Sequence, residues 1–315
     1  MPDLSVRIGE LSLRSPIVLA SGIVGYGTEY GPLIDLDAVG AVVLKTVTLE
    51  PRRGNRPPRL RETEGGLLNA IGLENVGLES FLEEKLPESA GLPVPLVASV
   101  GPSDADESAR LAGAIGARDE VVAVELNISC PNVERARLPL WADPEGVLDV
   151  VTAAREATSK PVLVKLSPNV ADIVSVALAA ERAGAEALVV ANTLTGMRID
   201  LERRAPALGN VTGGLSGPAL LPVNLALVWK VSEAVAIPIV GSGGASTAGH
   251  VLEYMMAGAT AVQVGTAIFA DPRAPELMAH DLERTMTEDG CDSLADYVGL
   301  ARRTGVRCGQ RVATG

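Results

Sequence analysis

Short apolar runs, each bounded by glycine, proline or polar residues, recur along the whole chain. Runs of this length and composition are typical of strands buried on both faces of a parallel sheet. Most intervals between them carry a helical pattern rich in Ala, Leu and Glu, as in 171–183 and 222–236. The pattern predicts eight strands, at 17–20, 41–44, 95–98, 121–126, 161–164, 187–190, 237–240 and 261–264.

Eight strands alternating with helices predict an α/β fold of the (β/α)8 or TIM-barrel class. An open doubly wound sheet is the alternative, but its usual GxGxxG sequence is missing after the first strand. Residues 4–8 and 11–14 alternate around Gly9-Glu10, which predicts an N-terminal β-hairpin covering the bottom of the barrel. The intervals 50–92 and 133–145 are predicted to be long loops over the top face, the first with a short helix.

Composition favours one domain spanning residues 1–315, since 47% of the residues are hydrophobic and neither a linker nor a longer repeat interrupts the alternation. No apolar run reaches membrane-spanning length, and MPDLSVRIGE lacks the features of a signal peptide. We therefore expect a cytoplasmic protein without membrane contact. The net charge of -12 also argues against nucleic acid as a partner.

The cysteines and histidines of the chain are few. Cys130, Cys291 and Cys308 lie far apart with no CxxC pair, so no zinc or iron–sulfur ligand set is predicted. With only two histidines, proton transfer near neutral pH is expected to fall to another side chain.

The residues that follow the strands of such a barrel line its active site. Here they are mostly polar, include two lysines and almost no carboxylate, and so argue against a metal site. The strand ends carry Ser21, Lys45, Thr46, Ser99, Asn127, Cys130, Asn132, Lys165, Asn192, Thr193, Gly243, Gly244, Gly265 and Thr266.

Glycines end strands seven and eight, at Gly243-Gly244 and Gly265-Thr266, and a helical stretch starts at Ala248. Backbone amides freed by glycine, together with a helix N-terminus, suit a phosphate, although tight turns alone also explain such glycines. The pairing on adjacent strands favours a phosphorylated cofactor. Lys45 and Lys165 favour an anionic ligand over two snorkelling lysines, and a Schiff-base aldolase remains an alternative.

Cys130 is bracketed by Asn127 and Asn132, and Asn69 and Asn192 are predicted to reach the same face. A lone cysteine is usually an inert small hydrophobe, and a single Asn often forms a turn. Four carboxamides around one thiol instead suit a planar ring with alternating C=O and N–H groups.

Four segments form a specific set: 127–132 (NISCPN), 164–168 (VKLSP), 192–194 (NTL) and 213–219 (GGLSGPA). Together they closely resemble the dihydroorotate dehydrogenases of pyrimidine synthesis, and the similarity runs from 20–22 to 264–267. The NIS sequence before the cysteine and GMRID at 196–200 are most similar to class 1B. That class is a catalytic subunit that works with an iron–sulfur and FAD subunit and passes electrons to NAD.

The resemblance implies one FMN per chain and oxidation of dihydroorotate to orotate. Cys130 matches the base that takes the C5 proton while flavin N5 takes the C6 hydride, and Lys165 matches the lysine that stabilises the reduced flavin. It implies FMN contacts at Ser21, Lys45, Thr46, Ser99, Asn127, Lys165, Val190, Gly217, Gly243, Gly244, Gly265 and Thr266. It implies substrate contacts at Lys45, Asn69, Ala70, Ile71, Gly72, Leu73, Asn127, Asn132, Asn192 and Thr193.

The resemblance further implies a homodimer of this chain with two partner subunits, which hold the FAD and the 2Fe-2S clusters. Two positions depart from the family pattern: the segment 134–141 (ERARLPLW) lacks the usual glycines, and Ser99 replaces a frequent Asn. A class 1A homodimer that uses fumarate is the nearest alternative. An RNA dihydrouridine synthase, which needs a basic surface, and a catalytically silent scaffold are more distant ones.

Overall fold

The computed structural model describes residues 2–30, 33–129 and 140–303, and its centre is a closed barrel of eight parallel strands. All eight predicted strands are confirmed, and the order around the barrel follows the order along the chain. The strands are β3 (Ile17–Leu19), β4 (Ala41–Val43), β7 (Leu96–Val100), β8 (Val121–Asn127), β9 (Val162–Lys165), β10 (Ala187–Val190), β15 (Ile239–Ser242) and β16 (Ala261–Val264).

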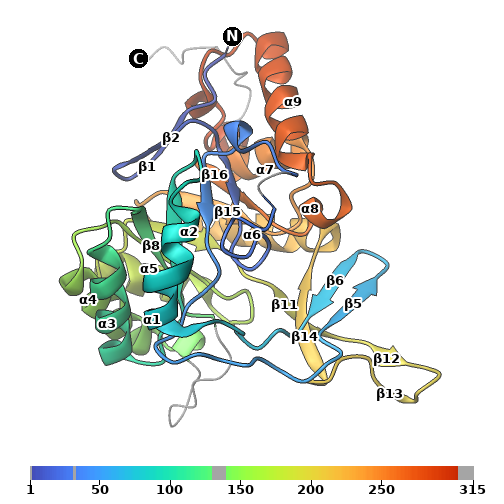
Figure 1. Cartoon of the computed structure of the whole chain (residues 1–315). Coiled ribbons are helices and arrows are strands. Elements are labelled where there is room, and N and C mark those ends of the chain that lie inside the picture. Colours follow the sequence, from blue (N-terminus) through green and yellow to red (C-terminus); the bar gives the residue numbers. More distant parts are fainter. Residues whose placement is uncertain (1, 31–32, 130–139, 304–315) are drawn as a thin grey trace.

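Helices pack around the barrel and bury the outer face of its apolar strands. Every residue of β10, for example, is fully buried. The predicted helices before Gly184 and before Ile237 are confirmed as α5 and α6, and the stretch from Ala248 is confirmed as α7. The outer layer consists of α3 (Ala105–Gly116), α4 (Pro144–Ala157), α5 (Ile173–Arg182), α6 (Leu221–Ser232), α7 (Ala248–Ala257), α8 (Ala267–Ala270) and α9 (Ala274–Asp289) (Figure 1).

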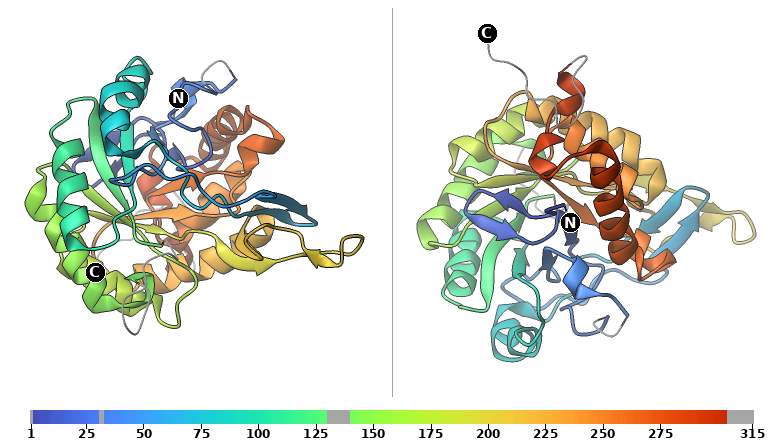
Figure 2. Two further views of the ribbon diagram at one scale, coloured as in Figure 1. Left: turned by 60° about the horizontal axis from the view of Figure 1, so that its bottom comes forward. Right: turned by 90° about the horizontal axis from the view of Figure 1, so that it is seen from above.

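The N-terminal hairpin is confirmed as β1 (Val6–Ile8) paired with β2 (Leu11–Leu13). Ile8, Leu11 and Leu13 enclose a cavity of about 10 Å³ together with inward-facing residues of the barrel strands. The hairpin therefore closes the bottom of the barrel, across which it lies in the right view of Figure 2.

The opposite end of the barrel carries a second sheet that the sequence did not predict. The interval 50–92 was expected to hold loops and a short helix; it does contain α1 (Gly77–Ser80), η2 (Phe81–Lys85) and α2 (Leu86–Ser89). It also forms the hairpin of β5 (Leu60–Thr63) and β6 (Gly66–Asn69), which joins β11 (Leu194–Met197) and β14 (Thr212–Ser216) in a four-stranded antiparallel sheet. Figure 1 shows this sheet projecting beside the barrel, with β12 (Ile199–Asp200) and β13 (Ala205–Pro206) beyond it.

The described residues lack two kinds of feature. None of their helices has the length and apolar character needed to cross a bilayer. Within the same ranges, no group of three or more His, Cys, Asp and Glu side chains is arranged to hold a metal ion.

Candidate active site

A cavity of about 1210 Å³ opens at the carboxyl ends of the barrel strands, beneath the four-stranded sheet. The strand ends form its floor, and residues 60–73 and 210–218 form much of one wall. Such a volume at this end of a barrel accommodates a cofactor and a small substrate together.

Most of the predicted site residues line this one cavity. Ser99 and Val190 are fully buried and do not line it, and Cys130 and Asn132 lie outside the described residues. The predicted residues that the cavity brings together are Ser21, Lys45, Thr46, Asn69, Ala70, Ile71, Gly72, Leu73, Asn127, Lys165, Asn192, Thr193, Gly217, Gly243, Gly244, Gly265 and Thr266.

A chain of hydroxyl groups connects the carboxyl ends of strands β3, β4 and β7 at the cavity floor. The Ser21 hydroxyl donates to the carbonyl of Leu44 at 2.8 Å, and its oxygen lies 3.1 Å from Thr46 Oγ1. Thr46 Oγ1 lies 2.9 Å from Ser99 Oγ and accepts a bond of 3.4 Å from Asn127 Nδ2. Ser99 thus acts on the cavity through Thr46.

Amide and hydroxyl groups at the ends of β8 and β10 form a second cluster. Ser129 Oγ donates to Asn127 Oδ1 at 2.5 Å and accepts a short hydrogen bond from Asn192 Nδ2. Across the cavity, Asn69 Nδ2 donates to the carbonyl of Gly214 at 3.1 Å, which ties β6 to β14. Three of the predicted carboxamides therefore face one space, held by hydrogen bonds to different elements.

Lys45 and Lys165 bring two ammonium groups to the cavity in different surroundings. Burial lowers the pKa of Lys45, and the nearby carboxylate of Glu74 partly offsets this effect. Lys165 is only 5% exposed, and its Nζ donates to Gln263 Oε1 at 2.7 Å. Register places Lys165 beside Asn127 across β8 and β9.

Gln263 also bonds a buried carboxylate, that of Glu125, which was not among the predicted site residues. Its Nε2 donates to Glu125 Oε2 at 2.6 Å, and Glu125 is fully buried on β8. Side chains alternate along a strand, so Glu125 points to the same side as Asn127, two residues later. The sequence signal for Glu125 was therefore its position two residues before Asn127, a predicted site residue, on the same strand.

The glycines at the ends of β15 and β16 differ in what their backbone requires. Gly243 and Gly244 have positive φ values of 111° and 75°, a region that favours glycine. Gly265 has no such constraint, and a Cβ added there would meet only ordinary contacts, at 3.4 Å or more. Gly265 therefore lines the cavity without a backbone requirement for glycine.

The helix that follows Gly243 and Gly244 is α7, whose first turn is capped by Thr247 accepting from the His250 amide. The amide of Ser246 donates to His250 Nδ1 at 3.2 Å. With two lysines and a helix N-terminus, the donor set of the cavity suits a phosphate-bearing cofactor.

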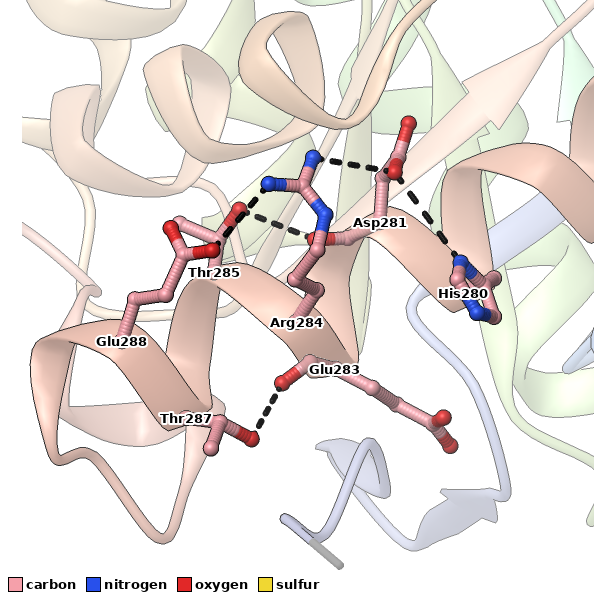
Figure 3. A network of polar contacts seen from close by, with 7 residues as sticks. All are labelled: His280, Asp281, Glu283, Arg284, Thr285, Thr287 and Glu288. Carbon is pink, nitrogen blue, oxygen red and sulfur yellow. Dashed lines mark hydrogen bonds and ion pairs between the residues drawn. The ribbon is translucent and has the colours of Figure 1, made fainter.

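The rim of the cavity is more exposed and includes Asp281 on α9. Asp281 pairs with Arg284 at 3.1 Å, and Arg284 also pairs with Glu288 at 3.2 Å. All three side chains are about half exposed, and Figure 3 shows Arg284 reaching toward both Asp281 and Glu288 along the helix. This network belongs to the surface of α9, beside the lysine-lined floor.

Comparisons with known proteins agree with this geometry. The family profile described as dihydroorotate dehydrogenase matches residues 3–286. The chain belongs to the dihydroorotate dehydrogenase family. It is 50% identical over 298 residues to the "Dihydroorotate dehydrogenase B (NAD(+)), catalytic subunit" of Trichlorobacter lovleyi, covering 95% of this chain and 98% of that protein.

The protein of the same description from Geobacter sulfurreducens is 49% identical over the same share of each chain. A crystal structure of the Eimeria tenella dihydroorotate dehydrogenase in complex with ferulenol superposes with a TM-score of 0.81 at 23% identity. It covers 96% of this chain and 89% of the other, which shows that the barrel fold is shared. Membership of this family implies use of a flavin, and the donor set of the cavity fits one.

Proposed function

We propose that this chain is the catalytic subunit of an NAD-linked dihydroorotate dehydrogenase, which oxidises (S)-dihydroorotate to orotate in pyrimidine biosynthesis. The observation that carries the proposal is the single cavity that gathers both predicted lysines, three of the predicted carboxamides and the strand-end glycines. High identity over nearly the whole length of relatives described as such subunits supports it.

FMN is proposed to occupy the floor of the cavity. Its phosphate would meet the backbone around Gly243, Gly244, Gly265 and Thr266, and its ring would meet Ser21, Lys45, Thr46, Asn127 and Lys165. Ser99 supports this floor from below through Thr46, and Val190 supports it from the end of β10. Bound FMN supplies the acceptor for the hydride that leaves C6 of the substrate.

The substrate is proposed to lie between the floor and the wall formed by residues 69–73. Asn69, Asn127, Asn132 and Asn192 offer donors and acceptors to the carbonyl and N–H groups of the ring, with Thr193 beside them. Lys45 meets the substrate carboxylate, and Cys130 accepts the C5 proton as its thiolate. Lys165 holds positive charge where the reduced flavin becomes negative.

A separate subunit is proposed to take the electrons onward, because the relatives are described as catalytic subunits and the three cysteines of this chain lie far apart with no CxxC pair. We propose two copies of this chain with two subunits that carry FAD and a 2Fe-2S cluster. We further propose that residues 1–315 form one domain and that the enzyme works in the cytoplasm.

Anaerobic mixing with dihydroorotate tests the core of the proposal. The purified chain should be yellow, and its flavin absorbance should bleach on mixing. The Cys130→Ala variant should hold the same amount of FMN and bleach at least about a hundredfold more slowly, because general base catalysis contributes on that order. Bleaching of the variant at the rate of the unmodified chain would remove Cys130 from the mechanism.

The electron acceptor needs its own measurement. The chain alone should fail to reduce NAD after bleaching, and NAD reduction should appear when an iron–sulfur flavoprotein subunit is added. Rapid reoxidation by fumarate without a partner would instead assign the chain to the fumarate-using class.

A further inference from the structure

The interior of the barrel holds a continuous polar chain of three side chains from three strands. Lys165 on β9 donates to Gln263 on β16 at 2.7 Å, and Gln263 donates to Glu125 on β8 at 2.6 Å. Their exposed fractions are 5%, 2% and 0%. Gln263 also lines the small cavity beneath the N-terminal hairpin, so the chain spans from the active-site floor toward the bottom of the barrel.

The direction of these hydrogen bonds follows from the groups themselves. An ammonium only donates, so the Gln263 oxygen must face Lys165, and the Gln263 amide nitrogen must then face Glu125. A carboxylate accepts this bond, and its second oxygen, Oε1, is buried without a hydrogen-bond partner among the described residues. Gln263 thus connects a buried positive group to a buried negative one without direct contact between them.

A fully buried carboxylate in an apolar strand needs a compensating gain, since burial of an ionised group costs free energy. Among the residues that the structure describes, Lys165 is the only charged group to which hydrogen bonds lead from Glu125. Apolar side chains at positions 125 and 263 would fill the barrel without this cost. The arrangement therefore points to a role tied to the ammonium of Lys165.

We propose that Glu125 and Gln263 are positioning residues for Lys165, and that they set how much positive charge the ammonium presents to the flavin. Gln263 fixes the location of the ammonium, and Glu125 moderates its field. The inference rests on the proposed binding of FMN over Lys165.

Two variants separate these roles. Glu125→Gln keeps an oxygen that can accept from Gln263 while it removes the negative charge. Reduction adds negative charge to the flavin, so loss of the carboxylate should favour the reduced form about tenfold, a rise of about 30 mV for a two-electron couple.

Gln263→Met keeps a similar volume but breaks the chain. The ammonium then loses its acceptor and can move down toward Glu125, away from the cavity. The reduced form should be disfavoured about tenfold, a fall of about 30 mV. The two variants are thus expected to shift the midpoint potential in opposite directions.

The experiment measures the FMN midpoint potential of the holoenzyme by spectroscopic titration, beside FMN affinity and thermal unfolding. Ser108→Ala is the control, because Ser108 is a buried hydroxyl that donates to the Val150 carbonyl at 2.8 Å, between α3 and α4. This control should lose some stability and keep its potential. Opposite shifts in the two test variants support the proposal.

Shifts of the midpoint potential smaller than about 5 mV, or shifts opposite in sign to those stated, would overturn the positioning role. This holds even if both variants were less stable. If one variant does not fold, the sign of the shift in the other decides. A protein that binds no FMN refutes the proposed function itself, whereas FMN bound at an unchanged potential refutes only this inference.

Discussion

Two polar networks of this protein each combine basic and acidic side chains, and they differ in how far these side chains are exposed to solvent. In the barrel, Lys165, Gln263 and Glu125 are at most 5% exposed. On α9, the side chains of Asp281, Arg284 and Glu288 are 48%, 56% and 62% exposed (Figure 3). Interactions between charges strengthen as water is excluded, and the barrel bonds of 2.7 and 2.6 Å are also shorter than the α9 pairs at 3.1 and 3.2 Å.

The comparison teaches that burial and separation along the chain, beside distance, distinguish a functional charge from a surface pair. The α9 pairs follow the helix spacings of three and four residues, which is typical of a solvated face. The barrel chain joins residues 98 and 138 positions apart and fixes one ammonium at the cavity floor. We expect changes in the barrel to affect catalysis and changes on α9 to affect little.

Lys165→Met should have the largest effect. Loss of the ammonium removes the positive charge near the reduced flavin, and the rate of flavin reduction by dihydroorotate should fall about 10²–10³-fold. Stopped-flow absorbance measures this rate, with FMN content as the control for folding. A rate within threefold of the unmodified enzyme would show that the Lys165 ammonium, although buried, has no catalytic role.

Lys45→Met tests the lysine of intermediate burial. KM for dihydroorotate should rise about tenfold to a hundredfold, because a charge-assisted contact to an anion is lost. Steady-state kinetics measures it. A larger effect on kcat than on KM would instead place Lys45 in the chemical step.

The stability of the FMN-free protein should depend on pH through Lys45. Burial lowers the pKa of Lys45 in the folded state, so the unfolded chain binds more protons between that lowered pKa and the usual 10.5. The free energy of unfolding should therefore gain a positive slope with pH across this window. Below the window the ammonium costs stability at a constant level. Urea titrations of the Lys45→Met variant should show a flatter dependence on pH, and an equal slope would contradict the burial effect.

Thr46→Val should reduce stability by about 1–3 kcal/mol, since it leaves buried partners at Ser99 and Asn127 without their hydrogen-bond group. The matched control is Thr287→Val on α9, where the exposed hydroxyl bonds only the Glu283 carbonyl of its own helix. Denaturant unfolding of both variants measures the contrast. Equal losses would show that the barrel position carries no special cost.

Arg284→Ala should have the smallest effect. Its two carboxylate partners raise the pKa of Arg284, but all three groups are solvated, and the midpoint of thermal unfolding should move by less than about 2 °C. Flavin reduction should stay at the unmodified rate. A scan in low and high salt checks this, and a clear loss of activity would extend the active site to the rim.

The sequence predicted the barrel well because its strands are continuous apolar runs. The sheet of β5, β6, β11 and β14 was missed, because Leu60–Thr63 is largely exposed and Thr212–Ser216 contains Gly213-Gly214 in place of an apolar pattern. Neither segment carries a local strand signal. Leu60–Thr63 pairs with β6 within one hairpin, and Thr212–Ser216 pairs with β11 and with the distant β6.

Most site residues were predicted by their place at strand ends and by the resemblance. Glu125 and Gln263 were missed because each lies inside an apolar run, where a polar residue looks like an interruption of the strand. Closure of the barrel brings Gln263 on β16 between Lys165 and Glu125. The roles of Cys130 and Asn132, which fall outside the described residues, stay predictions.

The hydrogen bond from Asn69 to Gly214 joins positions 145 residues apart, and the same sheet pairs Leu68 with Leu215. One wall of the active site is therefore made jointly by two insertions into the barrel. A chimera that exchanges either insertion alone would replace one side of the β6–β14 pairing and leave the other side unchanged. When this enzyme is recombined with a relative, the two segments should be exchanged together.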